Sequence, residues 1–216
     1  MWENELFALD EEFQTAVVAK NKNDEVIAHA KAIKTQSKLF ARRAASEKAL
    51  ADVLPAEIEQ GDAWHVLSAG DVDSFSYLAH ILKTHNLDYC AFSTWCMAIP
   101  DVEQLKIWCE SGKIKRLDGY VGEIFPNQYG EEYEELQKVI ATTGGRVCVF
   151  KNHSKIFLCR AGEKYWVVES SANINTNPRA ENAVVTGSKE LFLHHKAYFD
   201  GVKSFDKNPR FIKIAP

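Results

Sequence analysis

From residue 63 onward, apolar runs of strand length alternate with amphipathic segments of helical length. The apolar runs are typical of buried strands, and the segments between them carry apolar residues at the three- and four-residue spacing of a helix. Strands are predicted at 63–70, 87–95 and 114–122, and helices at 71–85, 101–112 and 131–144. Strands that alternate with helices in this way predict a mainly parallel sheet with helices on its faces.

The alternation ends after residue 144. Four strand-like segments follow with no room for helices between them, at 145–152, 153–162, 164–171 and 181–187. An amphipathic segment over 188–205 then predicts a closing helix that covers one sheet face. The expected fold class is therefore α/β: a three-layer α/β/α sandwich with a mixed, mainly parallel sheet, formed by residues 61–216.

Residues 1–60 differ from the rest and are predicted to be a helical N-terminal arm. Residues 4–50 contain no proline or glycine, and good helix formers recur in them at helical spacing, so two or three helices are expected. The segment begins acidic and continues with a basic run of Lys31, Lys34, Lys38, Arg42, Arg43 and Lys48. One interpretation is a helix that binds a phosphate backbone through Lys34, Arg42 and Arg43, and the alternative is a solvated charged face.

Composition narrows the class of protein. The chain has 216 residues, of which 46% are hydrophobic and 26% charged, which is typical of one main globular domain and argues against disorder. At a net charge of -4, any polyanion has to be bound by a local basic patch. The five cysteines form no CxxC pair, so neither a structural zinc site nor a disulfide framework is expected. With an acidic start and no apolar run of membrane-spanning length, we expect a cytoplasmic protein without membrane contact.

Candidate chemistry gathers in the second half of the chain. His153 and Lys155 stand two residues apart at the start of a strand-like segment, so both are expected on one face of that strand. The polar residues that follow at suggestive positions are Ser171, Asn173, Asn175 and Glu181. Together they combine a potential nucleophile, a cation, hydroxyl and amide donors, and a carboxylate.

Such a group suits attack on phosphorus. A neutral imidazole is nucleophilic near neutral pH, so His153 is the candidate nucleophile and Glu181 the carboxylate predicted to orient its ring. Lys155 and Asn173 are predicted to hold the phosphate oxygens as negative charge builds in the transition state. Asn175 is a candidate substrate contact. The alternative for His153, taken alone, is a packed histidine whose hydrogen bonds are satisfied within the core.

The order of these residues resembles a known pattern. HSK, followed by SSAN and then ENAVV, is similar to the HxKxxxxD and GSxN motifs of the phospholipase D superfamily, and especially to those of its bacterial nuclease branch. The matching residues are His153, Lys155, Ser171, Asn173 and Glu181. The resemblance covers about residues 62–206 and implies a phospholipase D-like domain with these five as catalytic residues.

Two positions depart from the motif. Arg160 stands where the motif has its aspartate, and Ser170 replaces the glycine of GSxN. In the family that aspartate supports the motif, so a cation in its place favours a catalytically inactive protein that binds nucleic acid in the same groove. Glu181 is present in the expected order and favours the enzyme. Both hypotheses stay open at this point.

The resemblance also implies a mechanism. In the family, one histidine forms a phosphohistidine while a second protonates the leaving oxygen and then activates water. Two other histidines of this chain, His29 and His194, also have a lysine two residues on, but neither is followed nearby by an SxN sequence as His153 is. The resemblance therefore implies a symmetric homodimer in which His153 of each subunit faces the same site. It implies no metal or other cofactor, and a substrate that is nucleic acid or another phosphodiester.

Two further features bear on substrate binding. Trp64, Trp95, Trp108 and Trp166 have apolar neighbours, so core positions are expected, with base stacking as the alternative. The segment 123–131 follows a predicted parallel strand and is expected to be a loop that borders the pocket, because ligand sites gather where parallel strands end.

Overall fold

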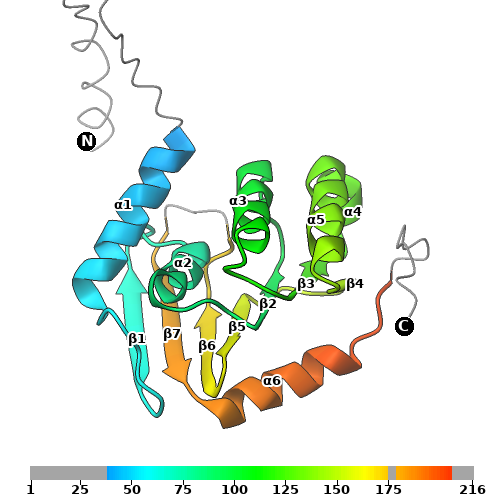
Figure 1. Cartoon of the computed structure of the whole chain (residues 1–216). Coiled ribbons are helices and arrows are strands. Elements are labelled where there is room, and N and C mark those ends of the chain that lie inside the picture. Colours follow the sequence, from blue (N-terminus) through cyan, green and yellow to red (C-terminus); the bar gives the residue numbers. More distant parts are fainter. Residues whose placement is uncertain (1–37, 175–178, 206–216) are drawn as a thin grey trace, which may run out of the picture. The chain divides into compact units, whose positions relative to one another are not determined.

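The computed structural model describes residues 38–174 and 179–205, with side chains from residue 43 onward (Figure 1). The helices are α1 (Lys38–Val53), α2 (Ser74–Thr84), α3 (Ile99–Glu110), α4 (Phe125–Gln128), α5 (Gly130–Thr142) and α6 (Lys189–Gly201). The strands are β1 (Ala63–Ser68), β2 (Tyr89–Thr94), β3 (Leu117–Gly122), β4 (Val147–Phe150), β5 (Ile156–Ala161), β6 (Lys164–Ser170) and β7 (Glu181–Gly187). The helices predicted before residue 38 lie outside the described residues.

The seven strands form one mixed sheet in the order β1-β7-β6-β5-β2-β3-β4. The prediction of a mixed sheet in an α/β fold is confirmed, but the prediction that the sheet is mainly parallel is wrong. Only β2–β3 and β3–β4 are parallel pairs, and the other four pairs are antiparallel. The reason is that β5, β6 and β7 insert between β1 and β2, so α2 joins two strands that run in the same direction without being neighbours.

Helices cover both faces of the sheet, which confirms the three-layer arrangement. On one face, α1, α2, α3 and α5 contribute the buried side chains Leu50, Phe75, Leu78, Leu105 and Leu136 to the larger core. On the other face, α6 buries Phe192 and Phe199 against a second core. Figure 1 shows α6 running along the face opposite to that of α2, α3 and α5. Helix α1, predicted as part of the N-terminal arm, packs against α2.

Local signals explain most of the element boundaries. Helix α2 begins after Asp73, whose carboxylate accepts a hydrogen bond of 2.8 Å from the Ser76 amide, as an N-cap does. The predicted hairpin between β5 and β6 turns at Gly162, whose φ of 57° favours glycine. The predicted loop at 123–131 instead contains α4, with Pro126 in its first turn, where a missing amide proton costs nothing.

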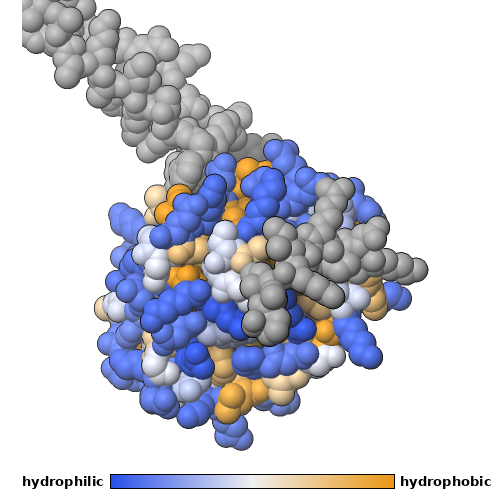
Figure 2. Space-filling model, turned by 45° about the vertical axis from the view of Figure 1, so that its right-hand side comes forward, coloured by the Kyte–Doolittle hydropathy of each residue, from blue (hydrophilic) through white to orange (hydrophobic). Residues whose placement is uncertain are grey.

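The surface is mixed in character. On the face that Figure 2 shows, hydrophilic side chains predominate and apolar ones form small separate patches. Among the helices of the described ranges, none has both the length and the apolar character that a membrane span requires.

Candidate functional site

One edge of the sheet gathers the ends of several strands. Strands β1, β2, β3, β4 and β6 end there, and β5 and β7 begin there, as the pairing registers require. His153 and Lys155 lie at this edge, in the connection between β4 and β5. The prediction that both belong to a strand is therefore wrong, because β5 begins at Ile156, one residue after Lys155.

The two motif residues contact each other directly. Lys155 Nζ lies 2.9 Å from Nδ1 and 3.3 Å from Nε2 of His153, and it donates a hydrogen bond of 2.6 Å to the His153 carbonyl oxygen. The imidazole is exposed to solvent, whereas only 6% of Lys155 is exposed. An ammonium can donate to an imidazole nitrogen only where that nitrogen carries a lone pair, which is also what a nucleophile needs.

The surroundings of Lys155 act on its charge in two directions. Burial lowers the pKa of the ammonium from its ordinary value of 10.5, because a low-dielectric environment disfavours the charged form. The Cys96 thiol and the Glu181 carboxyl group lie near enough to act the other way and raise that pKa. The site thus holds a buried amine whose charge is supported by two neighbours from other parts of the sheet edge.

A buried amide fixes the connection that carries His153. The Asn152 side chain is 4% exposed, and its Nδ2 donates to Ser93 Oγ at 2.9 Å, to the Tyr120 carbonyl at 3.0 Å and to the Thr94 carbonyl at 3.2 Å. Its Oδ1 accepts from the Ser154 amide at 3.0 Å. Asn152 and Ser154, the residues on either side of His153, are thus bonded to each other, and Asn152 is bonded to the carboxyl ends of β2 and β3. These bonds set the position of His153.

Two side chains that follow β2 border the motif. The Trp95 ring lies 5.8 Å from the His153 ring, centroid to centroid, at an interplanar angle of 55°. Trp95 is partly exposed, whereas Cys96 beside it is buried. The expectation that Trp95 is a core residue is thus only half correct, because its indole packs on the core and also reaches the site.

The downstream polar residues form a second group at the same edge. Ser171 Oγ donates a short hydrogen bond to the Glu181 carboxylate, and the Asn182 amide donates to Ser171 Oγ at 3.0 Å. Asn173 follows in the same bend, and its buried Oδ1 has no hydrogen-bond partner within the described part of the chain. Glu181 was predicted to orient the imidazole, but among the described residues its carboxylate bonds to Ser171 and not to His153. The structure connects Glu181 to the motif through the charge of Lys155.

The residues predicted to bind substrate are not brought to this edge by the described part of the chain. Lys34, Asn175 and the side chain of Arg42 lie outside the described residues. Arg43 is 8% exposed, forms an ion pair with the buried Asp101, and places its guanidinium 4.6 Å from the centroid of the Phe75 ring. In this arrangement Arg43 stabilises the contact between α1 and its neighbours and is not open to a phosphate backbone.

Arg160, at the position of the motif aspartate, is far from the site. It lies near the end of β5, where it pairs with Tyr89 and Tyr165, whereas Lys155 precedes the first residue of that strand. Five residues of extended chain span about 16 Å. A cation at position 160 therefore does not reverse the field around His153 and Lys155.

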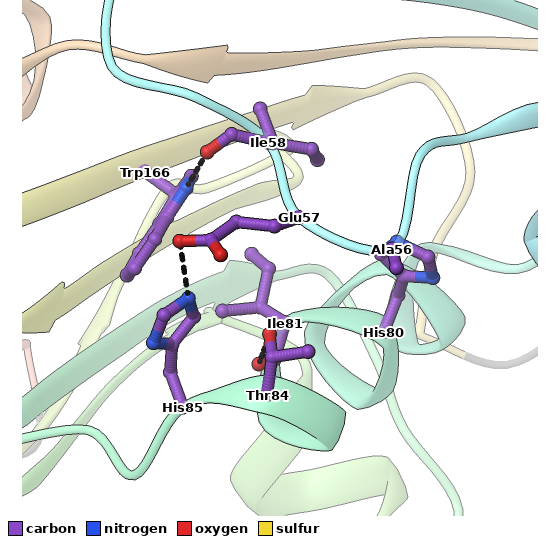
Figure 3. Close-up of a pocket in the computed structure, with 8 residues that line it drawn as sticks. All are labelled: Ala56, Glu57, Ile58, His80, Ile81, Thr84, His85 and Trp166. Atoms are coloured by element: carbon purple, nitrogen blue, oxygen red, sulfur yellow. Dashed lines mark hydrogen bonds and ion pairs between the residues drawn. The ribbon is translucent and has the colours of Figure 1, made fainter.

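A small cavity lies at the edge of the sheet opposite to His153 (Figure 3). Figure 3 shows Glu57 reaching toward His85, whose Nε2 lies 3.3 Å from Glu57 Oε1. The His85 ring packs against Trp166 at 4.6 Å between centroids, and Trp166 Nε1 donates to the Ile58 carbonyl at 2.9 Å. These contacts fasten the connection between α1 and β1, so the cavity belongs to the packing of that connection.

Sequence reasoning missed Asn152, Ser93 and Cys96. Ser93 and Thr94 end a strand that is buried along its whole length, and Asn152 follows another buried strand by two residues. Polar residues at strand ends were the available signal, because such ends meet at one edge of a sheet. Within residues 38–174 and 179–205, no three side chains of His, Cys, Asp or Glu come together as a metal site.

Comparisons with known proteins find likenesses in structure only. No protein-family model matches the sequence, and neither does any curated protein. A solved polyphosphate kinase from Porphyromonas gingivalis is similar over 66% of this chain and 24% of its own, at 16% identity and a TM-score of 0.48. A phosphatidylserine synthase from Haemophilus influenzae Rd KW20 is similar over 64% of this chain and 37% of its own, at 13% identity and a TM-score of 0.43.

The likeness covers only 24% and 37% of the length of these two proteins. With TM-scores below 0.5, neither likeness transfers an activity, substrate or partner to this chain.

Proposed function

We propose that this protein is a metal-independent phosphodiesterase that cleaves nucleic acid through a phosphohistidine at His153, in a site completed by a second copy of the chain. The single observation that carries the proposal is the pair of an exposed imidazole and a buried lysine amine in direct contact, 2.9 Å apart, at the edge where the strands end. The nucleic-acid substrate rests on the resemblance of the HSK and SSAN sequences to the nuclease branch.

In the proposed reaction, phosphodiester hydrolysis takes place in two steps. An imidazole nitrogen of His153 attacks phosphorus, the bond between phosphorus and the leaving oxygen breaks, and a second histidine donates a proton to that oxygen. Water, deprotonated by the same second histidine, then attacks the phosphohistidine and restores the free imidazole. Lys155 supplies positive charge to the phosphate oxygens as negative charge builds on them, a role that elsewhere falls to metal ions.

The proposed site needs two histidines. His29 and His194 are the other histidines with a lysine two residues on, but neither is followed nearby by an SxN sequence like that of Ser171 and Asn173. The second histidine is therefore proposed to be His153 of another copy. In a symmetric dimer, the same surface of both copies meets at the two-fold axis, and each site residue is supplied twice. Two copies of Lys155 and Asn173 would then surround one phosphate.

The first experiment tests the reaction. Purified protein is expected to hydrolyse bis-p-nitrophenyl phosphate in the presence of a chelator, and His153→Asn is expected to abolish this turnover. His194→Asn, on the exposed face of α6, is the matched control and is expected to keep full activity. Mass spectrometry after rapid alkaline quenching is expected to find a phosphorylated peptide that contains His153.

The second experiment tests the shared site. After subunits of wild type and His153→Asn are mixed in equal amounts and exchanged at random, about one quarter of the wild-type activity is expected, because only dimers with two histidines work. A monomer by sedimentation together with one half of the activity would contradict the shared site.

The inactive nucleic-acid-binding protein is the other outcome of these experiments. It predicts no hydrolysis by wild type but retained binding of DNA or RNA. The observation that favoured it in the sequence, a cation at position 160, loses force because Arg160 lies at the far end of β5.

A further inference from the structure

We propose that Trp95 is a substrate-contacting residue that stacks on an unpaired base, so that the substrate is single-stranded nucleic acid. The inference deepens the proposed function and rests on His153 being the residue that engages the phosphate. Trp95 directly follows β2 at the site edge, and its ring centroid lies 5.8 Å from that of His153. Part of the indole is open to solvent.

The fold makes room for this indole. A Cβ on Gly122, the last residue of β3, would lie 2.7 Å from Trp95 Cδ1, 3.1 Å from the Trp95 carbonyl oxygen and 3.2 Å from the Asn152 carbonyl oxygen. Gly122 is not among the glycines with positive φ, so its backbone is open to other residues. Glycine is therefore needed there because of its small size. The room that it leaves lets Trp95 lie between the end of β3 and the connection that carries His153.

The chemistry of an indole at this position limits its partner. An apolar ring gives no direct stabilisation to the charge that builds on phosphate oxygens, but it binds planar groups well. Every base has a planar face, and stacking on an aromatic side chain tolerates any sequence. Bases within a duplex stay stacked on one another, so a base that reaches Trp95 from the phosphate at His153 must be unpaired.

A purely structural role for Trp95 makes a different prediction. If the indole only held the imidazole in place, its removal would lower kcat equally for every phosphodiester and leave affinity unchanged. If it stacks on a base, its removal raises KM and Kd for substrates with bases and leaves substrates without bases unaffected.

The test compares two single strands of equal length and charge, a labelled oligothymidylate and an abasic oligonucleotide. Wild type is expected to bind the oligothymidylate roughly tenfold more tightly by fluorescence anisotropy, with the same ratio in KM. Trp95→Ala is expected to remove this preference, and Trp95→Phe to keep part of it. Gly122→Ala, which displaces the indole without deleting it, is expected to weaken the preference too. Trp64→Ala, a partly exposed tryptophan on β1, is the matched control and is expected to keep the preference.

The outcomes separate this inference from the proposed function. Equal affinity of wild type for both strands, with cleavage present, would overturn the role of Trp95 and leave the phosphodiesterase standing. A preference for bases that is lost in Trp95→Ala, without any cleavage, would support the stacking site and remove the enzyme. A preference that survives in Trp95→Ala would overturn the inference, whatever the rate of cleavage.

Discussion

The two ends of strand β5 differ in the burial and pairing of the polar side chains around them. Near its start, Lys155 is a buried cation that contacts the exposed imidazole of His153, and the neighbouring Asn152 is a buried amide. At its far end, the charged groups are more exposed and form ion pairs with each other, as Asp88 does with Lys115 at 2.7 Å and Glu57 does with Lys164.

The difference separates function from stability along one strand. A buried ammonium such as that of Lys155 costs stability when its charge is not fully compensated, so its presence at this edge favours a functional role. Exposed ion pairs at the other edge each contribute little, and they are common on any surface. Changes at the His153 edge are therefore expected to alter activity strongly, and changes at the Arg160 edge to leave it almost unaltered.

Lys155 is expected to give the largest effect. Lys155→Ala removes the cation next to the imidazole, and the loss of one such transition-state contact typically lowers kcat by roughly 10²- to 10³-fold. Because burial lowers the pKa of this ammonium, its charge is lost as the pH rises, before the pH reaches 10.5. Wild-type activity is expected to decline over that rise. Lys155→Arg keeps its charge throughout, since the guanidinium pKa is above about 12.

The measurement is kcat/KM between pH 6 and 10.5, with thermal unfolding over the same range. Whatever activity Lys155→Arg retains is expected to lack the alkaline decline, and a decline identical to that of wild type would assign it to another group. The sign for stability follows from the same lowered pKa: the cost of the buried charge is fully present below the folded-state pKa. It is relieved as the pH rises from that value to the unfolded pKa near 10.5.

Asn152 is expected to give the next largest effect. Asn152→Ala leaves the carbonyl groups of Thr94 and Tyr120 without their donor in a buried place, which is expected to lower the free energy of unfolding by about 2–4 kcal/mol. Because the same amide positions His153, kcat is expected to fall in the protein that remains folded. Urea unfolding and kcat on bis-p-nitrophenyl phosphate measure the two losses.

Asn182→Ala is the control for that experiment. Asn182 is exposed on β7 at the same edge, and its side chain makes no hydrogen bond to other described residues, so a change of less than about 0.5 kcal/mol is expected. A stability loss in Asn152→Ala as small as that would contradict the bracing role of the buried amide.

Arg160 tests the comparison from the other end of the strand. Arg160→Asp restores the aspartate of the motif, yet the kcat/KM is expected to stay within about twofold of wild type, because about 16 Å along β5 separates the position from Lys155. A small loss of thermal stability is expected, since the new carboxylate lies near Asp88. A tenfold gain in kcat/KM would show that the two ends of β5 are coupled.

Much of the fold could be predicted from periodicity, because each strand from β1 to β7 and most helices have a clear pattern of apolar residues. Strand order could not, since it depends on how the hairpin strands β5 to β7 insert between β1 and β2, and no local pattern records that insertion. The mainly parallel sheet was wrong for this reason. The short helix α4 was missed because four residues carry no periodicity.

The candidate-site residues that could be predicted are those marked by their type and spacing in the sequence. Those whose role depends on their position in the fold could not be predicted. His153 and Lys155 were found from their types and spacing, and the structure brings them into contact. Asn152 and Trp95 act through position alone: one is a buried amide among carbonyl groups, and the other is an indole that fits beside a glycine. Such roles depend on the packing of distant segments, which a single sequence does not display.

Glu57 is expected to give the smallest effect, confined to stability. The hydrogen bond from Lys164 lowers the pKa of the Glu57 carboxyl group below 4.5, and the charges of Lys164 and His85 add to this. A lowered carboxyl pKa contributes stability above about pH 4.5 that is lost as the pH falls through the folded-state value. Glu57→Gln is therefore expected to melt at a temperature slightly below that of wild type at pH 7 and at the same temperature at the acid end, with unchanged kcat at pH 7.

Glu163→Gln, in an exposed pair with Lys189, is the control for a surface ion pair that does not border the cavity. A melting difference that persists undiminished at pH 3, or any loss of kcat in Glu57→Gln, would contradict the separation of the two sheet edges.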